Sequence, residues 1–495
     1  MPGAEIKALR EAGQLLEALD MAKSEYQESP EDSWALNSLV WVYDAICKKN
    51  AEEGNLDAFR ESFNDIVSLK VLDSNDILNN SLCWRFLSLT KTISSKLKDN
   101  EIQDAGNILF SLAKELHPQI PSKQYSILLQ AFLKLKEKWN GFYGFFEWWG
   151  FRNFTEEDYE SRRLSNGKTM MSVAEEAFLA SSKCLLIKKN VDDIKTLISE
   201  LEYVNEKYPR MTYIGYYLGK LLLCIGDRNN ALDKLLPFAK KKKDEFWIWQ
   251  LLSETQNDDN IRLACLMRAE KCRTQNDYLV NVRQALAEEL IKQGDYETAK
   301  KQIEKLVLAR SNNNWKLPDE VQSWIRSDWY NKPIDKSKAI NIDYMTITND
   351  LLFSDMEEFQ AIVSFVNVEK KIATVITGNK QIGFFNFERF HLMLKVGNVL
   401  NIRANNQSGY INVVSLRKVD SIDDNDYYKT INAIVSSTDE GRLYVEYDSR
   451  RLFLSDQVLK GVEIEVGEEL TIKILFDFNK KYEKWGWRCI SIKKV

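Results

Sequence analysis

Residues 218–239 read LGKLLLCIGDRNNALDKLLPFA, and residues 286–307 read LAEELIKQGDYETAKKQIEKLV. Apolar and small residues recur at identical offsets in the two stretches, on both sides of a Gly-Asp pair that begins at Gly226 in the first and at Gly294 in the second. Each stretch predicts a helix, a tight turn at the conformationally permissive glycine, and a second helix. An alanine in the second helix is small enough to let the two helices of a pair approach closely.

A third copy begins near the N-terminus, where one helix is closed by small residues and a proline, namely Gly13, Ala18, Ala22 and Pro30. The next helix opens at Ser33-Trp34-Ala35-Leu36, about one 34-residue period after the first. This pattern resembles the tetratricopeptide repeat (TPR) family. The resemblance implies a right-handed helical solenoid over residues 1–310, and an irregular helical bundle is the alternative.

The composition of the 495 residues is that of a globular protein, with 44% hydrophobic and 28% charged residues. This length predicts about three structural units. The 68 Lys and Arg residues nearly balance the 73 Asp and Glu residues, which gives a formal net charge of −5. A chain with this balance is not a polybasic binder, so any affinity for nucleic acid must come from a local patch of placed side chains.

The sequence also bears on the compartment. No apolar signal segment follows Met1, and no run of about 18 apolar residues predicts a membrane span. The 7 cysteines are odd in number and include no Cys-x-x-Cys pair, so we expect reduced and mostly buried thiols. The sequence therefore predicts a cytoplasmic protein that does not contact membranes.

A dense aromatic segment interrupts the repeat at about residues 139–170. Such a density of rings forms either an unusually thick local core or a surface that recognises a partner. We interpret the segment first as an elaborated repeat that packs into the solenoid. The candidate residues for the second interpretation, contact with a protein partner, are Trp148, Trp149 and Phe151.

The pattern changes after the last repeat. Residues 311–356 predict a connector with a short helix, and beyond it short β-branched and aromatic runs are broken by Gly, Asn and Asp. We expect two small β-barrels, at residues 357–420 and 428–495. The predicted fold class is therefore multidomain, an all-α TPR-like solenoid followed by two barrels of the OB or cold-shock type.

The first barrel resembles a cold-shock-type OB fold, on a strand that ends in an aromatic residue and Asn367, a Glu-Lys turn, a Phe-containing third strand, and Lys-x-Gly before the next strand. Such barrels stack bases on exposed aromatic side chains, while Lys and Arg follow the phosphates. The resemblance implies a nucleic-acid-binding set made of Phe365, Lys371, Lys380, Phe384, Phe385 and Phe387.

The second barrel offers a further set of candidates. Tyr444 and Phe453 fall on neighbouring strands and are predicted to pair across them. Near the C-terminus, aromatic and basic residues interleave, and the candidates for nucleic-acid contact there are Lys480, Lys481, Lys484, Trp485, Trp487 and Arg488. The alternative is a β-hairpin whose aromatic residues point inward and whose lysines are solvated at the tip.

Nothing in the sequence predicts an enzyme. It contains no Gly-x-x-x-x-Gly-Lys-Ser/Thr phosphate loop, no Gly-x-Gly-x-x-Gly and no Gly-x-Ser-x-Gly. The two histidines, His117 and His391, lack the neighbours that acid–base catalysis or metal binding needs. We therefore expect no catalytic residue, no metal ligand and no cofactor.

The order of parts, a TPR-like solenoid followed by OB or cold-shock-like barrels, resembles proteins of prokaryotic conflict systems of the TOTE type. The resemblance implies a non-catalytic adaptor in antiviral defence, with RNA or single-stranded DNA on the barrels and a protein partner on the solenoid. Two alternatives stay open. One is a pure protein–protein scaffold whose barrels are structural, and the other is an unrecognised hydrolase or nuclease.

Overall fold

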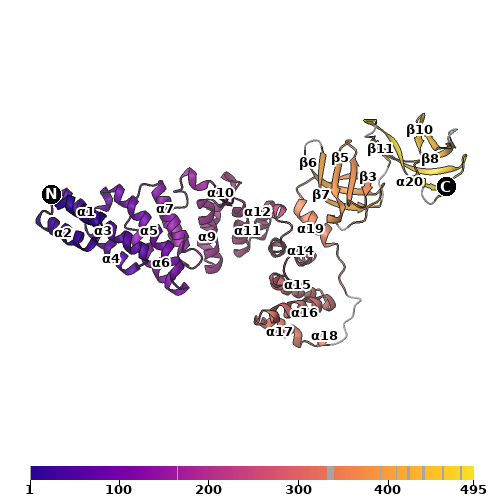
Figure 1. Cartoon of the computed structure of the whole chain (residues 1–495). Coiled ribbons are helices and arrows are strands. Elements are labelled where there is room, and N and C mark those ends of the chain that lie inside the picture. Colours follow the sequence, from indigo (N-terminus) through magenta and orange to yellow (C-terminus); the bar gives the residue numbers. More distant parts are fainter. Residues whose placement is uncertain are drawn as a thin grey trace. The chain divides into compact units, whose positions relative to one another are not determined.

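The computed structural model describes residues 2–163, 166–331, 339–390, 392–407, 410–420, 424–437, 441–459, 462–479 and 482–494 (Figure 1). The chain divides into two compact units, Met1–Lys242 and Lys243–Val495, which are treated separately below. The division falls inside the range expected to form one solenoid, because the last helix pairs belong to the same unit as the β-domains.

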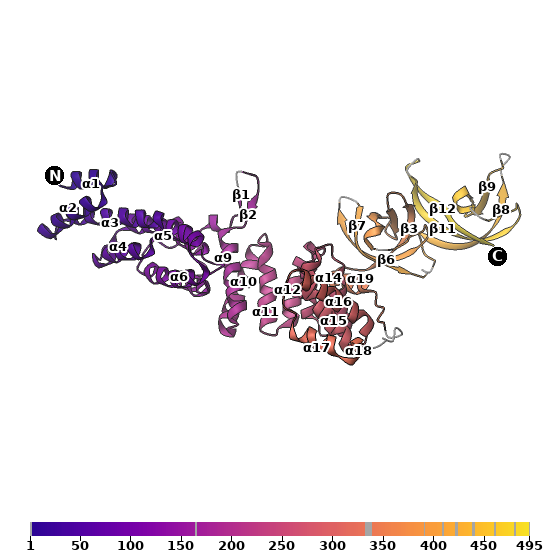
Figure 2. The ribbon, with the colours of Figure 1, turned by 60° about the horizontal axis from the view of Figure 1, so that its bottom comes forward.

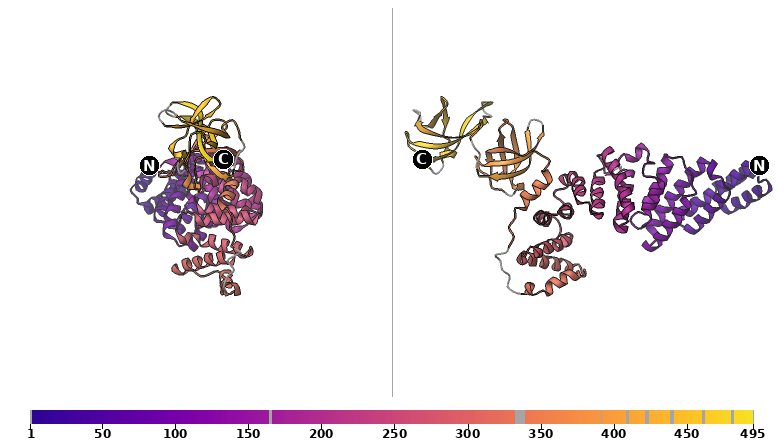
Figure 3. Two further views of the ribbon diagram at one scale, coloured as in Figure 1. Left: turned by 90° about the vertical axis from the view of Figure 1, so that its right-hand side faces the viewer. Right: turned by 180° about the vertical axis from the view of Figure 1, so that it is seen from behind.

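The first unit is a series of antiparallel helices, in which most helices pack on the next helix along the chain and some pack on the next but one (Figures 1 and 3). Its helices are α1 (Pro2–Glu11), α2 (Leu15–Glu28), α3 (Ser33–Glu53), α4 (Leu56–Ser68), α5 (Asp76–Lys96), α6 (Asp99–Ala113), α7 (Lys123–Leu133), α8 (Phe142–Trp149), α9 (Val173–Lys188), α10 (Val191–Lys207), α11 (Thr212–Cys224) and α12 (Arg228–Lys241). A short hairpin of β1 (Arg162–Arg163) and β2 (Thr169–Met170) projects from these helices in Figure 2.

The second unit combines helices and strands. Its helices are α13 (Phe246–Thr255), α14 (Asp259–Lys271), α15 (Val280–Lys292), α16 (Tyr296–Asn312), α17 (Asp319–Arg326), α18 (Asp328–Asn331), α19 (Tyr344–Phe353) and α20 (Asp456–Leu459). Its strands are β3 (Phe359–Asn367), β4 (Ile372–Thr377), β5 (Ile382–Asn386), β6 (Val399–Gln407), β7 (Tyr410–Val419), β8 (Tyr428–Ser437), β9 (Leu443–Tyr447), β10 (Arg450–Phe453), β11 (Glu469–Asn479) and β12 (Lys484–Lys494).

The repeated Gly-Asp pair forms the same turn in both of its copies. Gly226 and Gly294 have φ angles of 84° and 85°, in the left-handed region that favours glycine. The side chain of Asp227 accepts a hydrogen bond from the backbone N–H three residues later and caps α12, and Asp295 does the same for α16. The predicted helix–turn–helix pairs and the TPR-like solenoid are therefore confirmed.

The aromatic segment is mostly core. Trp149 is fully buried, and its ring stacks on Tyr125 with centroids 4.7 Å apart. Its Nε1 donates to the backbone carbonyl of Tyr125 at 3.0 Å. The prediction that Trp149 contacts a partner is therefore wrong, because its ring has no exposed surface. Phe151 is half-buried against Phe146, and Trp148 is the most exposed of the three candidates.

The first β-domain is a closed five-stranded barrel with the strand order β3-β4-β5-β7-β6. Parallel pairing of β5 with β7 closes the barrel. The resulting strand order is that of an OB fold. The second β-domain has the order β10-β9-β8-β11-β12, so it repeats the same order but lacks hydrogen-bonded pairing between β10 and β12 among its described residues. The predicted second barrel is therefore a half-barrel, whose two edge strands approach each other.

Helix α19 joins the helical part of the second unit to the first barrel. On one side, Nη1 of Arg268 in α14 donates to Oγ1 of Thr348 at 2.7 Å and to Oδ1 of Asn349 at 2.8 Å. Burial lowers the pKa of Arg268 to about 10. On the other side, Asp350 pairs with Arg403 of β6. The predicted connector at residues 311–356 thus contains a packed helix with polar contacts on both sides.

Within the part of the chain that the structure describes, none of the helices combines the length and the apolar character that crossing a bilayer requires.

Glycines beside Trp139 test the packing of the first unit. A Cβ atom at Gly106 in α6 would lie 2.6 Å from the fully buried ring of Trp139, whereas a Cβ at Gly144 in α8 would meet nothing within 4 Å. We expect Gly106→Ala to lower the free energy of unfolding by about 1–2 kcal/mol, because the clash outweighs the gain in helix propensity. Gly144→Ala is the matched control and should raise it by up to about 1 kcal/mol. Urea denaturation measures both, and equal effects would contradict this packing.

The cysteines give a second test of burial. Cys224 is exposed, whereas Cys47, Cys83, Cys184, Cys265 and Cys489 are buried and Cys272 is half-buried. Burial raises the pKa of Cys83 and of Cys265 to about 12, and that of Cys272 to about 11, which suppresses the reactive thiolate at pH 8. We expect iodoacetamide at pH 8 to label Cys224 first, as read by peptide mass spectrometry. Equally fast labelling of Cys83 in the folded protein would contradict the structure.

Candidate nucleic-acid interface

An exposed aromatic row crosses three strands of the first barrel. Phe365 of β3 is paired with Thr374 of β4, which in turn is paired with Phe384 of β5. The side chains of Phe365 and Phe384 are 56% and 38% exposed, so both rings present part of their surface to solvent. We call Phe365, Thr374 and Phe384 the first row.

A β-bulge turns Phe365 outward. The pairing of β3 with β4 shifts between Val363 and Phe365, so that Ser364 is the extra residue. Ala361 and Val363 point into the barrel core, and strict alternation would send Phe365 inward with them. The bulge reverses this alternation and places the Phe365 ring on the outer face.

The residues next to the first row point into the barrel, namely Phe385 on β5 and its partner Ala373 on β4. Phe385 is only 7% exposed and belongs to the core, where its ring meets Phe390 edge-to-face with centroids 5.6 Å apart. The prediction that Phe385 binds nucleic acid is therefore wrong, since its ring cannot reach a base without opening the barrel. Phe387 is half-buried against the same core. Ile372 is a further exposed residue that the sequence analysis did not include. It lies two residues before Thr374 on β4, so the alternation of side chains along the strand predicts that both lie on the same face.

The basic candidates of this barrel lie at its turns. Lys371 lies between β3 and β4 and pairs with Glu388, which offsets part of its charge. Lys380 lies between β4 and β5, and its Nζ is 5.2 Å from the ring centroid of Phe476 in the second β-domain. Because the charge of Lys371 is already partly offset, these two candidates together attract a polyanion only weakly.

The second β-domain carries a matching row on its corresponding strands. Ser436 of β8 is paired with Tyr444 of β9, which is paired with Phe453 of β10. The rings of Tyr444 and Phe453 lie 5.6 Å apart, which confirms the predicted cross-strand pair. Phe453 is exposed and Tyr444 is half-exposed. We call Ser436, Tyr444 and Phe453 the second row.

The C-terminal hairpin is half-buried. Trp487 packs edge-to-face on Tyr447 inside the second β-domain, with centroids 5.7 Å apart. Trp485 stacks on Phe476 beside the contact between the two β-domains. Arg488 pairs with Asp477 and donates to the backbone carbonyl of Ser364. Lys484 is exposed, whereas Lys480 and Lys481 lie outside the described residues.

An apolar seam holds the two β-domains together, as they lie side by side in Figures 1 and 3. It is made of Ile362 and Ile376 from the barrel, Tyr427 and Tyr428 from the start of the half-barrel, and Leu475 and Ile490 from β11 and β12. The seam explains why the hairpin aromatics are not free. Phe476 and Trp485 complete its edge instead of forming a separate stacking surface.

Of the two histidines, His117 is the one that lies among the described residues. Nε2 of His117 lies 3.4 Å from Oδ1 of Asp73, and both side chains are largely exposed. His391 lies outside the described residues. Within the ranges that the structure covers, no three His, Cys, Asp or Glu side chains are grouped so that they could hold a metal ion.

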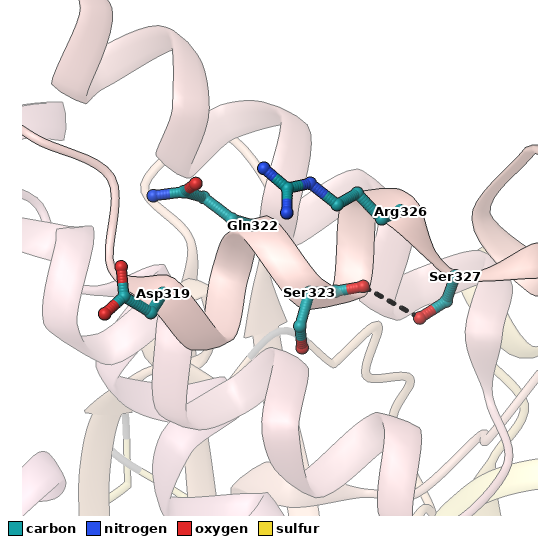
Figure 4. A pocket seen from close by; sticks show the side chains of 5 residues that line it. All are labelled: Asp319, Gln322, Ser323, Arg326 and Ser327. Atoms are coloured by element: carbon teal, nitrogen blue, oxygen red, sulfur yellow. Dashed lines mark hydrogen bonds between the residues drawn. The ribbon is translucent and has the colours of Figure 1, made fainter.

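A surface depression lies on α17, far along the sequence from both rows (Figure 4). Its five lining residues all come from α17 and its C-cap, namely Asp319, Gln322, Ser323, Arg326 and Ser327. Oγ of Ser327 donates to the carbonyl of Ser323, and the other side chains extend in different directions. The depression therefore offers no converging set of catalytic or binding groups.

Family comparisons match two parts of the chain. Residues 353–411 match the model described as S1/CSD-like domain 1 of the TOTE conflict systems. The first barrel is similar to that domain. Residues 212–345 match the model of a domain of unknown function, DUF7017. The two matched ranges are separated within α19, the helix that joins the last repeat helices to the S1/CSD-like barrel.

Solved structures that match this chain include a tetratricopeptide repeat protein from Parabacteroides merdae, which is 13% identical over 58% of this chain and 96% of that one, with a TM-score of 0.23. The TPR2AB domain of yeast Sti1, in complex with pHSP90, is 12% identical over 62% of this chain and 96% of that one, with a TM-score of 0.21. Human IFIT1, as a dimer with m7Gppp-AAAA, is 14% identical over 62% and 68%, with a TM-score of 0.20. Among curated proteins, the comparison found no match.

Proposed function

We propose that this chain is a non-catalytic adaptor of a prokaryotic defence system, which binds RNA or single-stranded DNA through its β-domains and a protein partner through its solenoid. The single observation that carries the proposal is the first row, which exposes Phe365 and Phe384 on the outer face of a barrel similar to an S1/CSD-like domain of the TOTE conflict systems.

The energetics favour stacking over charge. A base stacked on an aromatic side chain contributes about 1–3 kcal/mol, and the two rows together offer four rings. Of the two lysine candidates in the first barrel, Lys371 is already paired with Glu388. We therefore propose binding with a shallow salt dependence, because only a few counterions are released.

The direct test is fluorescence anisotropy with labelled single-stranded RNA and DNA over a salt series. We expect Phe384→Ala to weaken binding about 5- to 100-fold, since one stacked base is lost. Met393→Ala is the control, because Met393 is an exposed apolar residue of the same barrel outside the row. Binding that is absent at low salt, or unchanged in Phe384→Ala, would contradict the proposal.

The second row is tested in the same assay with Phe453→Ala. Weaker binding in this variant would extend the interface to both β-domains. Unchanged binding, with a loss in Phe384→Ala, would confine the interface to the first barrel.

A second candidate function is a protein scaffold whose β-domains are structural. The observation that favours it is the C-terminal hairpin, since Trp485 and Trp487 pack within the β-domains and at their seam. Recovery of a protein partner by a chain that binds no oligonucleotide would support this candidate.

The absence of catalysis is part of the proposal and has its own test. The full chain is incubated with labelled RNA and single-stranded DNA and each of several divalent metals, and we expect intact oligonucleotides on a denaturing gel. Metal-dependent cleavage that co-purifies with the chain would contradict a purely binding role.

A further inference from the structure

Three basic side chains gather where the helices of the second unit meet the first barrel. They are Lys243, which precedes α13, Arg268 of α14, and Arg389 of the short helical turn η5 (Phe387–Phe390) after β5. Helix α19 packs on α14 on one side and on β7 of the barrel on the other (Figure 1). The cluster therefore combines residues of both family-matched ranges, the helical one and the S1/CSD-like barrel.

The indole of Trp249 in α13 connects two of these residues. Its Nε1 donates to the backbone carbonyl of Lys243 at 2.6 Å, and Cζ of Arg268 lies 4.0 Å from its ring centroid. Trp249 is fully buried and holds both residues against the core. Burial lowers the pKa of Lys243, and the charges of Arg268 and Arg389 lower it further, so both guanidinium groups lie near the Lys243 ammonium.

The cluster contains no closely paired acid. Nη1 of Arg268 donates to two neutral oxygens of α19, and within the described ranges no carboxylate forms an ion pair with any of the three cations. Asp244 is the acid that acts through space on both Lys243 and Arg268, and its side chain is exposed. A partly buried cation without a counter-charge is costly, so a bound anion would be stabilised here.

The donor groups of the cluster match a phosphate. A guanidinium presents a planar array of N–H groups that fits phosphate oxygens, and a lysine adds a point charge. Nε and Nη2 of Arg268 have no bonded acceptor among the described residues. Lys243 and Arg268 are half-buried and Arg389 is exposed, so a ligand would approach from the side of Arg389.

The cluster lies within reach of the first row. Arg389 follows Phe384 by five residues, so their Cα atoms are at most about 18 Å apart. A single strand occupies about 4–16 nucleotides on an OB fold, which is long enough to contact both places. The rings of the first row can stack bases but cannot neutralise the backbone, and Lys371 is already paired with Glu388. The cluster can supply that charge.

We propose that Lys243, Arg268 and Arg389 bind one or two backbone phosphates of the single strand whose bases stack on the first row. This inference deepens the proposed function, on which it rests, because it extends the nucleic-acid interface from the S1/CSD-like barrel to the helices before it. Each neutralised phosphate contributes about 0.7 to the slope of log K against log salt, so the overall salt dependence stays shallow.

The first test compares charge-removing variants of the full chain in the anisotropy assay. We expect Arg389→Gln to weaken binding of single-stranded DNA about 3- to 10-fold at low salt and to reduce the salt slope by about 0.7. Arg389→Lys keeps the charge and should retain most of the binding. Lys316→Gln is the matched control, because Lys316 is an exposed cation of the same unit between α16 and α17. Equal binding by Arg389→Gln and Lys316→Gln would overturn the inference.

A strand with a neutral backbone separates phosphate contact from base stacking. Methylphosphonate DNA of the same sequence keeps the bases and removes the backbone charge. We expect Arg389→Gln to leave its binding unchanged, whereas Phe384→Ala still weakens it. An equal loss of both strands in Arg389→Gln would show a structural effect of the substitution and overturn the phosphate contact.

Acetylation tests the site without any substitution. Because its pKa is lowered, Lys243 has a larger neutral fraction than an ordinary lysine and reacts with limiting acetic anhydride. We expect single-stranded DNA to protect Lys243 and to leave Lys316 unchanged, as read by peptide mass spectrometry. Equal acetylation of Lys243 with and without DNA would overturn the site. Equal protection by inorganic phosphate, at the same concentration of phosphate groups, would overturn the assignment to a strand in favour of a free phosphate.

The variant Phe384→Ala separates this inference from the function on which it rests. Weaker binding in Phe384→Ala together with normal binding in Arg389→Gln would overturn only the phosphate contact. A full chain that binds no oligonucleotide at low salt would instead contradict nucleic-acid binding by the β-domains.

Discussion

Close approach between neighbouring helices is the constraint on which this molecule depends. A helix pair of a solenoid has more apolar surface than it can bury alone, so each pair must pack tightly on the next. At Gly219 in α11, a Cβ atom would lie 2.4 Å from the side chain of Leu235 in α12. In the same way, the ring of Trp139 lies so close to Gly106 and Gly141 that a Cβ atom at either glycine would clash with it. The sizes of a few side chains therefore set the spacing of the layers.

The two β-domains also bury apolar surface against each other, through side chains at the edges of their sheets. Two small domains of similar strand order each leave one apolar edge, and the seam around Ile362 and Leu475 covers both edges at once. The hydrogen bond from Arg488 to the carbonyl of Ser364 lies beside this seam and next to the bulge that exposes Phe365. The contact between the domains and the candidate binding face are thus structurally connected.

Aromatic side chains and not net charge distinguish the candidate surfaces of this chain. A net charge of −5 over 495 residues leaves little long-range attraction for a polyanion. Exposed rings at Phe365, Phe384 and Phe453 lie on the β-domains, and exposed indoles at Trp34 and Trp84 lie on the first unit. Rings on the β-domains are suited to stacking against bases.

The sequence by itself determined the parts of the fold that depend on local chemistry. Glycine at Gly226 and Gly294 dictates the turns, apolar periodicity dictates the helices, and alternation with turn residues dictates the strands, including the pairing of Tyr444 with Phe453. These features follow from the conformational preferences of neighbouring residues, so no distant contact is needed to predict them.

Only the tertiary structure decided which rings are exposed. Phe384 and Phe385 are adjacent in sequence and must point to opposite faces, but the barrel core determines that Phe385 is the buried one. A one-residue bulge, which no local pattern announced, reversed Phe365. Trp148 and Trp149 are likewise equivalent candidates in the sequence, but in the structure Trp149 stacks on Tyr125 and is buried. Exposure is a property of the packed neighbours, and those neighbours come from distant parts of the chain.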